Sequence, residues 1–123
     1  PPFFPIRTYL GQAHDIIDPI YVKAAAFRSG NQTVVFLSYD LVIIEWEYVQ
    51  RIREGIAGAG EIPATHVLVC ATHNHACPAV VDRPEHMKEH KYIEFFIERG
   101  IQAGLAALER LEPAELGLGH GVE

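Results

Sequence analysis

The sequence has no apolar run that approaches the roughly 18 to 20 residues a membrane-spanning helix needs. Its first five residues, Pro-Pro-Phe-Phe-Pro, lack the charged region and the long apolar region of a secretory signal peptide. An initiator methionine is also missing, which indicates an internal or trimmed piece of a longer protein. We therefore expect no transmembrane segment, and the sequence does not reveal a compartment.

Basic residues are few and scattered. Ten lysines and arginines stand against sixteen acidic residues, giving a formal net charge of −6 and no basic stripe. A protein that binds nucleic acid without sequence preference needs clustered cations to neutralise phosphates, so we expect no nucleic-acid partner. A phosphate-binding loop, a nucleophile elbow and a dinucleotide fingerprint are also absent.

Cysteine is scarce, with only Cys70 and Cys77 in the chain. Two cysteines are compatible with one disulfide, with two free thiols, or with one metal ligand and one core residue, and these alternatives stay open. Cys70 lies inside an apolar run, which favours a small buried thiol there.

The apolar share of the composition, 49% of 123 residues, is enough to bury the core of one soluble domain. Residues 20–27 and 33–38 are apolar or β-branched, and the turn-forming residues 28–32 separate them, which predicts a β-hairpin. Residues 43–57 change to a helical period. Four apolar side chains fall on one face of that helix: Trp46, Val49, Ile52 and Ile56.

The second half of the chain continues the alternation of strands and helices. The nearly continuous apolar run 66–71 predicts a strand buried on both faces, and residues 89–111 predict a long helix with one apolar stripe. Residues 115–121 resemble the start of another strand. The pattern predicts one α/β segment over residues 1–123, with a mixed β-sheet and crossover helices.

His73 and His75 are the strongest candidates for chemistry. They stand one residue apart in the turn that follows the run 66–71, where α/β proteins place their binding residues. On an extended backbone, side chains two apart point to one side, so both imidazoles could face a single zinc ion or polarised substrate. The alternative is a pair of loop histidines that are solvated or bonded to backbone carbonyls.

Two further residues could support these histidines. Asp40, at the end of the second strand, could orient an imidazole by accepting its other N–H, or could instead cap the following helix. Cys77 continues the alternation of the pair and is a weak alternative ligand. His86 and His90 lie four residues apart, and we expect both to be exposed helix residues because no HExxH glutamate accompanies them.

The order of these features resembles the N-terminal catalytic region of the neutral/alkaline non-lysosomal ceramidases. The most specific piece is the Thr-His-x-His-x-x-Pro element from Thr72 to Pro78. The other pieces cover nearly the whole chain, at residues 17–24, 34–40, 52–53 and 92–118. The resemblance implies a zinc amidohydrolase that cleaves ceramide, or a related lipid, into a sphingoid base and a fatty acid.

In the resembling family the first histidine of the pair is a zinc ligand, which implies that role for His73. The second histidine contacts the substrate or stabilises the developing oxyanion, which implies a catalytic role for His75. The family's other zinc ligands come from later in the chain, so the rest of the catalytic domain would be needed to complete the site. The family's compartment is secreted or at the membrane surface.

Three positions in the element depart from the family pattern. Asn74, Ala76 and Cys77 stand where the family has Thr, Ser and Gly, which puts the identity of the substrate in question. Two alternatives therefore remain open. The same metallohydrolase could act on a different amide or ester, or the chain could be a non-catalytic α/β binding module with structural histidines.

Overall fold

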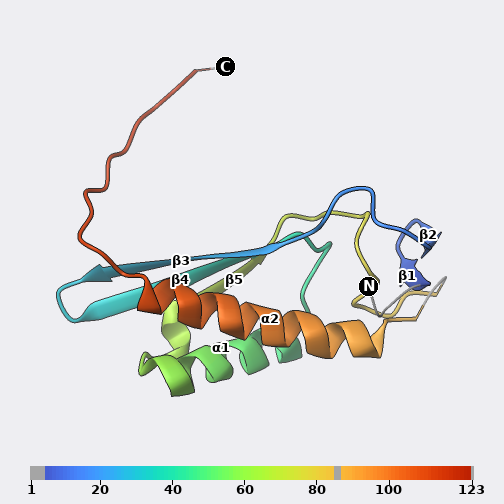
Figure 1. The fold of residues 1–123 in the computed structure, drawn as a ribbon, viewed down its shortest axis with the longest axis horizontal. Coiled ribbons are helices and arrows are strands. Elements are labelled where there is room, and N and C mark those ends of the chain that lie inside the picture. Colours follow the sequence, from blue (N-terminus) through green and yellow to red (C-terminus); the bar gives the residue numbers. More distant parts are fainter. Residues whose placement is uncertain (1–4, 85–86, 123) are drawn as a thin grey trace.

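The computed structural model describes residues 5–84 and 87–122, and Figure 1 shows a mixed α/β arrangement with two sheets and two long helices. The elements follow in the order β1 (Ile6–Thr8), β2 (Gly11–Ala13), β3 (Val22–Ser29), β4 (Gln32–Tyr39), α1 (Trp46–Gly60), a 3-10 turn (Ala64–His66), β5 (Val67–Ala71) and α2 (His90–Glu109). The expected α/β class is confirmed.

The main sheet has the strand order β3-β4-β5. β3 and β4 form the predicted antiparallel hairpin, in register from Val22–Tyr39 to Ser29–Gln32. Gly30 in the connecting turn has a φ of 59°, a conformation that costs glycine little because it has no Cβ. β5 then pairs parallel to β4, so α1 is the crossover that the sequence predicts.

Both helices cover the same face of this sheet (Figure 1). The strands direct alternate side chains to that face, and Val35, Leu37 and Tyr39 of β4 are at most 2% exposed. α1 contributes Tyr48, Val49, Ile52 and Ile56, and α2 contributes Ile93, Phe96 and Ile97. The core therefore lies between the helices and one side of the sheet.

Close approach of α2 to the sheet depends on Gly100. A Cβ at this position would overlap the hydroxyl of Tyr39. That hydroxyl donates a hydrogen bond to the backbone carbonyl of Phe96, at 3.3 Å. Burial raises the pKa of the Tyr39 hydroxyl, so it remains a neutral donor beneath the helix.

Several local predictions are wrong. The first helix begins at Trp46 rather than residue 43, and Trp46 itself is 65% exposed instead of facing the core. β5 is an edge strand with one uncovered face, so it is not buried on both faces and Cys70 is exposed. Residues 115–121 form no strand, because no neighbouring strand pairs with them.

The N-terminal hairpin β1–β2 is the element that the sequence pattern did not indicate. It is antiparallel and short, and Thr8 forms an isolated bridge with Pro78 of the loop after β5. The backbone N–H of Ala79 donates to the carbonyl of Arg7, at 2.8 Å. The Tyr9 hydroxyl accepts the N–H groups of Val80 and Val81, at 3.0 and 3.3 Å. The hairpin thus holds the loop that carries the histidines.

Within residues 5–84 and 87–122, neither helix is both long enough and apolar enough to cross a membrane.

Candidate functional site

The histidine turn follows the C-terminal end of β5, and hydrogen bonds join it to the end of β4 and the residues after it. The N–H of Thr72 donates to the carbonyl of Tyr39 at 2.9 Å, and the N–H of Asn74 donates to the carbonyl of Leu41 at 3.2 Å. The side chain of Asn74 closes the turn by accepting the N–H of Ala76, at 2.9 Å. These hydrogen bonds therefore fix the path of the turn at Thr72, Asn74 and Ala76.

His73 has left-handed backbone geometry, with a φ of 66°. This conformation costs a non-glycine residue about 1 to 2 kcal/mol, and such residues concentrate at functional sites. The backbone is therefore not extended through the pair, as the sequence argument assumed. The two rings nevertheless meet, because the left-handed residue turns them toward each other.

A backbone carbonyl orients the His73 ring. Nδ1 of His73 lies 2.8 Å from the carbonyl oxygen of Val42, an acceptor, so Nδ1 carries the hydrogen. The unprotonated Nε2 is then the nitrogen available for a metal ion or a proton. This arrangement, in which one ring nitrogen is bonded to the protein and the other points outward, is usual for metal-binding histidines.

His75 presents its own Nε2 to the same place. The Nε2 atoms of His73 and His75 lie 3.2 Å apart, and their ring centroids are 4.8 Å apart in a T-shaped arrangement. Without an ion, this separation allows the N–H of one ring to donate to the other. Two nitrogens that bind one zinc at about 2.0 to 2.1 Å with tetrahedral angles are about 3.3 to 3.4 Å apart, so the donors fit a small cation.

The described part of the chain contains no group of three or more His, Cys, Asp or Glu side chains placed to hold a metal ion. Residues 5–84 and 87–122 thus offer the two imidazoles as an incomplete donor set. Two neutral nitrogen ligands fall short of the three protein ligands of a catalytic zinc site.

Asp40 lies close to the turn but bonds to other groups. One carboxylate oxygen accepts the N–H of Tyr21 at 3.0 Å, and the other lies 3.5 Å from the Thr72 hydroxyl. The helix cap is Glu45, so Asp40 does not cap α1. Its contacts fix the start of the turn through Thr72, and the carbonyl of Val42 takes the place at His73 Nδ1 that the sequence argument gave to Asp40.

Neither cysteine has the environment that the sequence suggested, a buried thiol at Cys70 and a weak alternative ligand at Cys77. Cys77 is fully buried in the core, and burial raises the pKa of its thiol to about 11. A neutral, buried thiol is a poor zinc ligand, so this placement favours a packing role for Cys77. Cys70 is exposed, and both cysteines are free in this structure.

Two further histidines were considered in the sequence. His86 falls outside the described residues, and His90 is the exposed first residue of α2. Nδ1 of His66 lies 2.9 Å from the carbonyl oxygen of Thr33, so that ring ties the 3-10 turn to β4.

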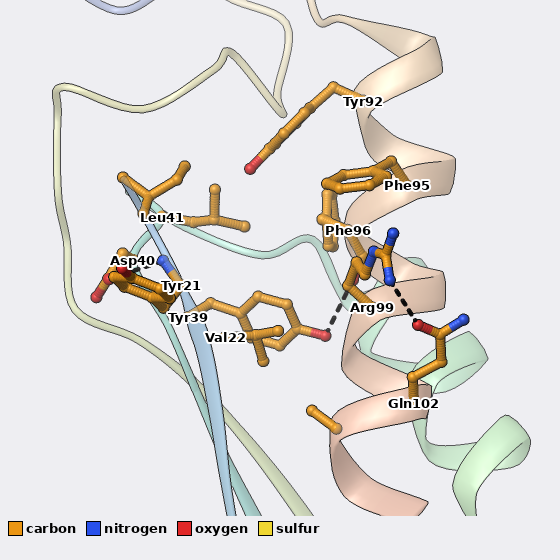
Figure 2. Close-up of a pocket in the computed structure, with 12 residues that line it drawn as sticks. Tyr21, Val22, Tyr39, Asp40, Leu41, Tyr92, Phe95, Phe96, Arg99 and Gln102 are labelled. Carbon is orange, nitrogen blue, oxygen red and sulfur yellow. Dashed lines mark hydrogen bonds between the residues drawn. The ribbon is translucent and has the colours of Figure 1, made fainter. Parts of the chain in front are cut away.

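A cleft of about 440 Å³ opens beside the turn, between the β3 and β4 ends and α2 (Figure 2). Its walls are mainly apolar and aromatic. They come from Ile20, Tyr21, Val22, Tyr39, Asp40, Leu41, Tyr92, Phe95, Phe96, Arg99, Gln102 and Ala103. Sequence patterns did not indicate this cleft, because, apart from Asp40, its residues carry no motif and belong to segments far apart in the chain.

The cleft and the histidine turn share part of their framework. Asp40 and Leu41 line the cleft, and the same two residues bond to Thr72 and Asn74 of the turn. Burial raises the pKa of the Tyr92 hydroxyl, which Figure 2 shows directed toward Leu41. The cleft and the turn are therefore linked through Asp40 and Leu41.

No protein-family model, curated protein or solved structure matches this chain.

Proposed function

We propose that this chain is part of a zinc-dependent amidohydrolase similar to the neutral ceramidases. The proposed reaction is hydrolysis of the N-acyl amide of ceramide, or of a related lipid, to a sphingoid base and a fatty acid. The imidazole pair carries the proposal: the Val42 carbonyl orients His73, and its Nε2 lies 3.2 Å from that of His75. The Thr72–Pro78 element and the apolar cleft add support.

The two histidines have different proposed roles. His73 would bind the metal through Nε2, because its Nδ1–H is already used by a backbone carbonyl. A bound zinc ion lowers the pKa of a coordinated water to about 7. His75, whose ring is exposed, would donate an N–H to the amide oxygen as that oxygen gains negative charge. Asp40 would position the turn through Thr72.

Further ligands must complete the metal site for this reaction. His73 alone is too few protein ligands for a catalytic zinc, so we include in the proposal that the remainder of a ceramidase-like catalytic domain supplies the others. The absence of a third donor among the described residues equally favours the alternative of a non-catalytic α/β binding module with structural histidines.

The substrate is the second point to test. Asn74 uses its side chain to close the turn, and Cys77 fills core space where the family has glycine. These substitutions change the shape beside the pair, so the same metallohydrolase chemistry on another amide or ester is the closest alternative.

Metal analysis and turnover separate the candidates. We expect the purified full-length protein, with the rest of its catalytic domain, to bind zinc, His73→Ala to lose it, and His75→Ala to keep zinc but lose about 10²- to 10³-fold in amide hydrolysis. His14→Ala, at an exposed histidine outside the Thr72–Pro78 element, is the control. The metallohydrolase proposal fails if the full-length protein binds no zinc. Hydrolysis of a non-lipid amide without ceramide turnover would favour the alternative substrate class.

A further inference from the structure

Within residues 5–84 and 87–122, no segment covers the face of the main sheet opposite the helices, and one half of that face is apolar. Strand register places Ala25, Phe36 and Leu68 in one row across β3, β4 and β5, with Phe27 and Val34 in the next row toward the β3–β4 turn. Phe27, Phe36 and Leu68 are 47%, 43% and 44% exposed. We call these five residues the open apolar face. Contiguous exposed apolar side chains of this kind mark an interaction surface.

The other half of the same face is more polar. The row beyond Phe36 consists of Lys23, Ser38 and Cys70. The open apolar face is therefore confined to the end of the sheet near the β3–β4 turn. Within it, the rings of Phe27 and Phe36 lie 5.8 Å apart in an edge-to-face contact, which leaves a compact aromatic surface.

The chain that follows α2 lies on the side of the sheet that carries this surface and, in this structure, extends away from it (Figure 1). α2 runs toward the end of the sheet that carries the β3–β4 turn, and the following residues leave to the side opposite the helices (Figure 1). Leu116, Leu118 and Val122 in this segment are 80%, 93% and 102% exposed. They are separated by even numbers of residues, so in a strand their side chains would share one face.

A place for this segment within the main sheet is disfavoured by topology. A strand beyond β3 and parallel to β5 would require α2 to cross back over the face that α1 already covers, which reverses the hand of the crossover. Right-handed crossovers make up about 98% of such connections. The free edge of β5 is also unsuitable, because α2 packs against β3 and β4.

We propose that residues 114–122 dock as a strand on the open apolar face, with Leu116 and Leu118 against Phe27 and Phe36. The segment belongs to the same molecule, so docking requires the ordering of its own residues and the closure of a short loop, but no loss of a second molecule's freedom. Nine extended residues span about 30 Å, whereas three strands are only about 10 Å wide from first to last. This strand would begin a second layer over the sheet.

Disulfide trapping with the native Cys70 tests the docking. Residue 120 shares the strand face of Leu116 and Leu118, and residue 119 points the opposite way. In the full chain under a mild oxidant, we expect His120→Cys to form an intramolecular bond with Cys70 about tenfold faster than Gly119→Cys, because docking raises the effective concentration. Peptide mapping identifies the bond. Equal rates, or a bond between two molecules, would overturn the proposal.

A second measurement avoids engineered cysteines. A thiol reagent should label Cys70 several-fold faster in the Leu116→Asp, Leu118→Asp double variant than in the unaltered chain, because the segment no longer covers the face. These residues are exposed in the undocked structure, so the substitutions leave the core intact. Glu112→Gln, also exposed, is the control. Unchanged labelling in the double variant would contradict docking.

Discussion

The two faces of the main sheet differ in how far their side chains are buried, although the same three strands form both. On the covered face, Val35, Leu37 and Tyr39 of β4 are almost fully buried beneath the helices. On the open face, Phe36 from the same strand remains 43% exposed. Period-two alternation thus separates a packed core from an apolar surface with no cover in this structure. The difference shows that hydrophobic residues in a strand do not by themselves specify burial on both sides.

The largest expected loss of stability comes from β4, where the neighbouring residues Leu37 and Phe36 face opposite sides of the sheet. Leu37→Ala should lower the free energy of unfolding by about 2 to 5 kcal/mol, because it leaves a cavity in the core. Phe36→Ala, on the opposite face, should cost less, because its ring lies outside this core and at most contacts the single docked segment 114–122. Denaturant unfolding measures both. Equal losses would contradict this difference between the two faces.

A smaller loss of stability is expected where α2 packs closely on the covered face, at Gly100. Gly100→Ala should destabilise the protein by up to about 3 kcal/mol, because the added methyl group overlaps Tyr39. Gly58→Ala in α1 meets no atom within 4 Å and should stabilise by about 0.5 to 1 kcal/mol. Adding Tyr39→Phe should recover part of the Gly100→Ala loss. Equal thermal melting temperatures for the two alanine variants would contradict this view of the interface.

The buried Cys77 and the exposed Cys70 should differ in how they affect the pH dependence of stability. Burial raises the pKa of Cys77 from 9.0 to about 11, so the fold favours the neutral thiol. Its contribution is fully present below pH 9 and is lost as pH rises through about 11, a change of about 3 kcal/mol. Cys77→Ala should flatten the fall in unfolding free energy over this range, whereas Cys70→Ala should not. Identical pH profiles for the two variants would contradict the assignment.

The smallest expected change in the free energy of unfolding concerns the histidine turn at the end of the sheet. His73→Gly should raise the free energy of unfolding by about 1 kcal/mol, because glycine adopts the left-handed conformation without strain. The same substitution should abolish zinc binding. His75→Ala should leave stability nearly unchanged. A destabilised His73→Gly variant would show that the ring contact with the Val42 carbonyl outweighs the strain.

Much of the framework was predictable because periodicity reports directly on packing. The β3–β4 hairpin, the parallel β4–α1–β5 unit and the stripe of α2 all follow from apolar spacing. The burial of β5 was not predictable, since it depends on which strand lies at the edge of the sheet. The strand expected at residues 115–121 depends likewise on a neighbouring strand, which the structure does not provide.

The candidate site was predictable only in part. The spacing of His73 and His75 indicated a shared target, and the structure brings their Nε2 atoms together. The left-handed φ of His73 and its bond to the Val42 carbonyl could not be read from residue types, because both depend on how the turn lies against the chain after β4. The cleft requires two distant segments to meet, which local sequence patterns do not record.

The N-terminal hairpin gives the loop after β5 a characteristic solvent-exchange signature. The amides of Ala79, Val80 and Val81 bond to Arg7 and Tyr9, about seventy positions earlier in the chain. Their deuterium uptake therefore measures detachment of the hairpin rather than opening of the sheet. A protease cut between β2 and β3 would let the N-terminal hairpin detach and would speed deuterium uptake at these three amides. The amides of β4 would keep their slow exchange.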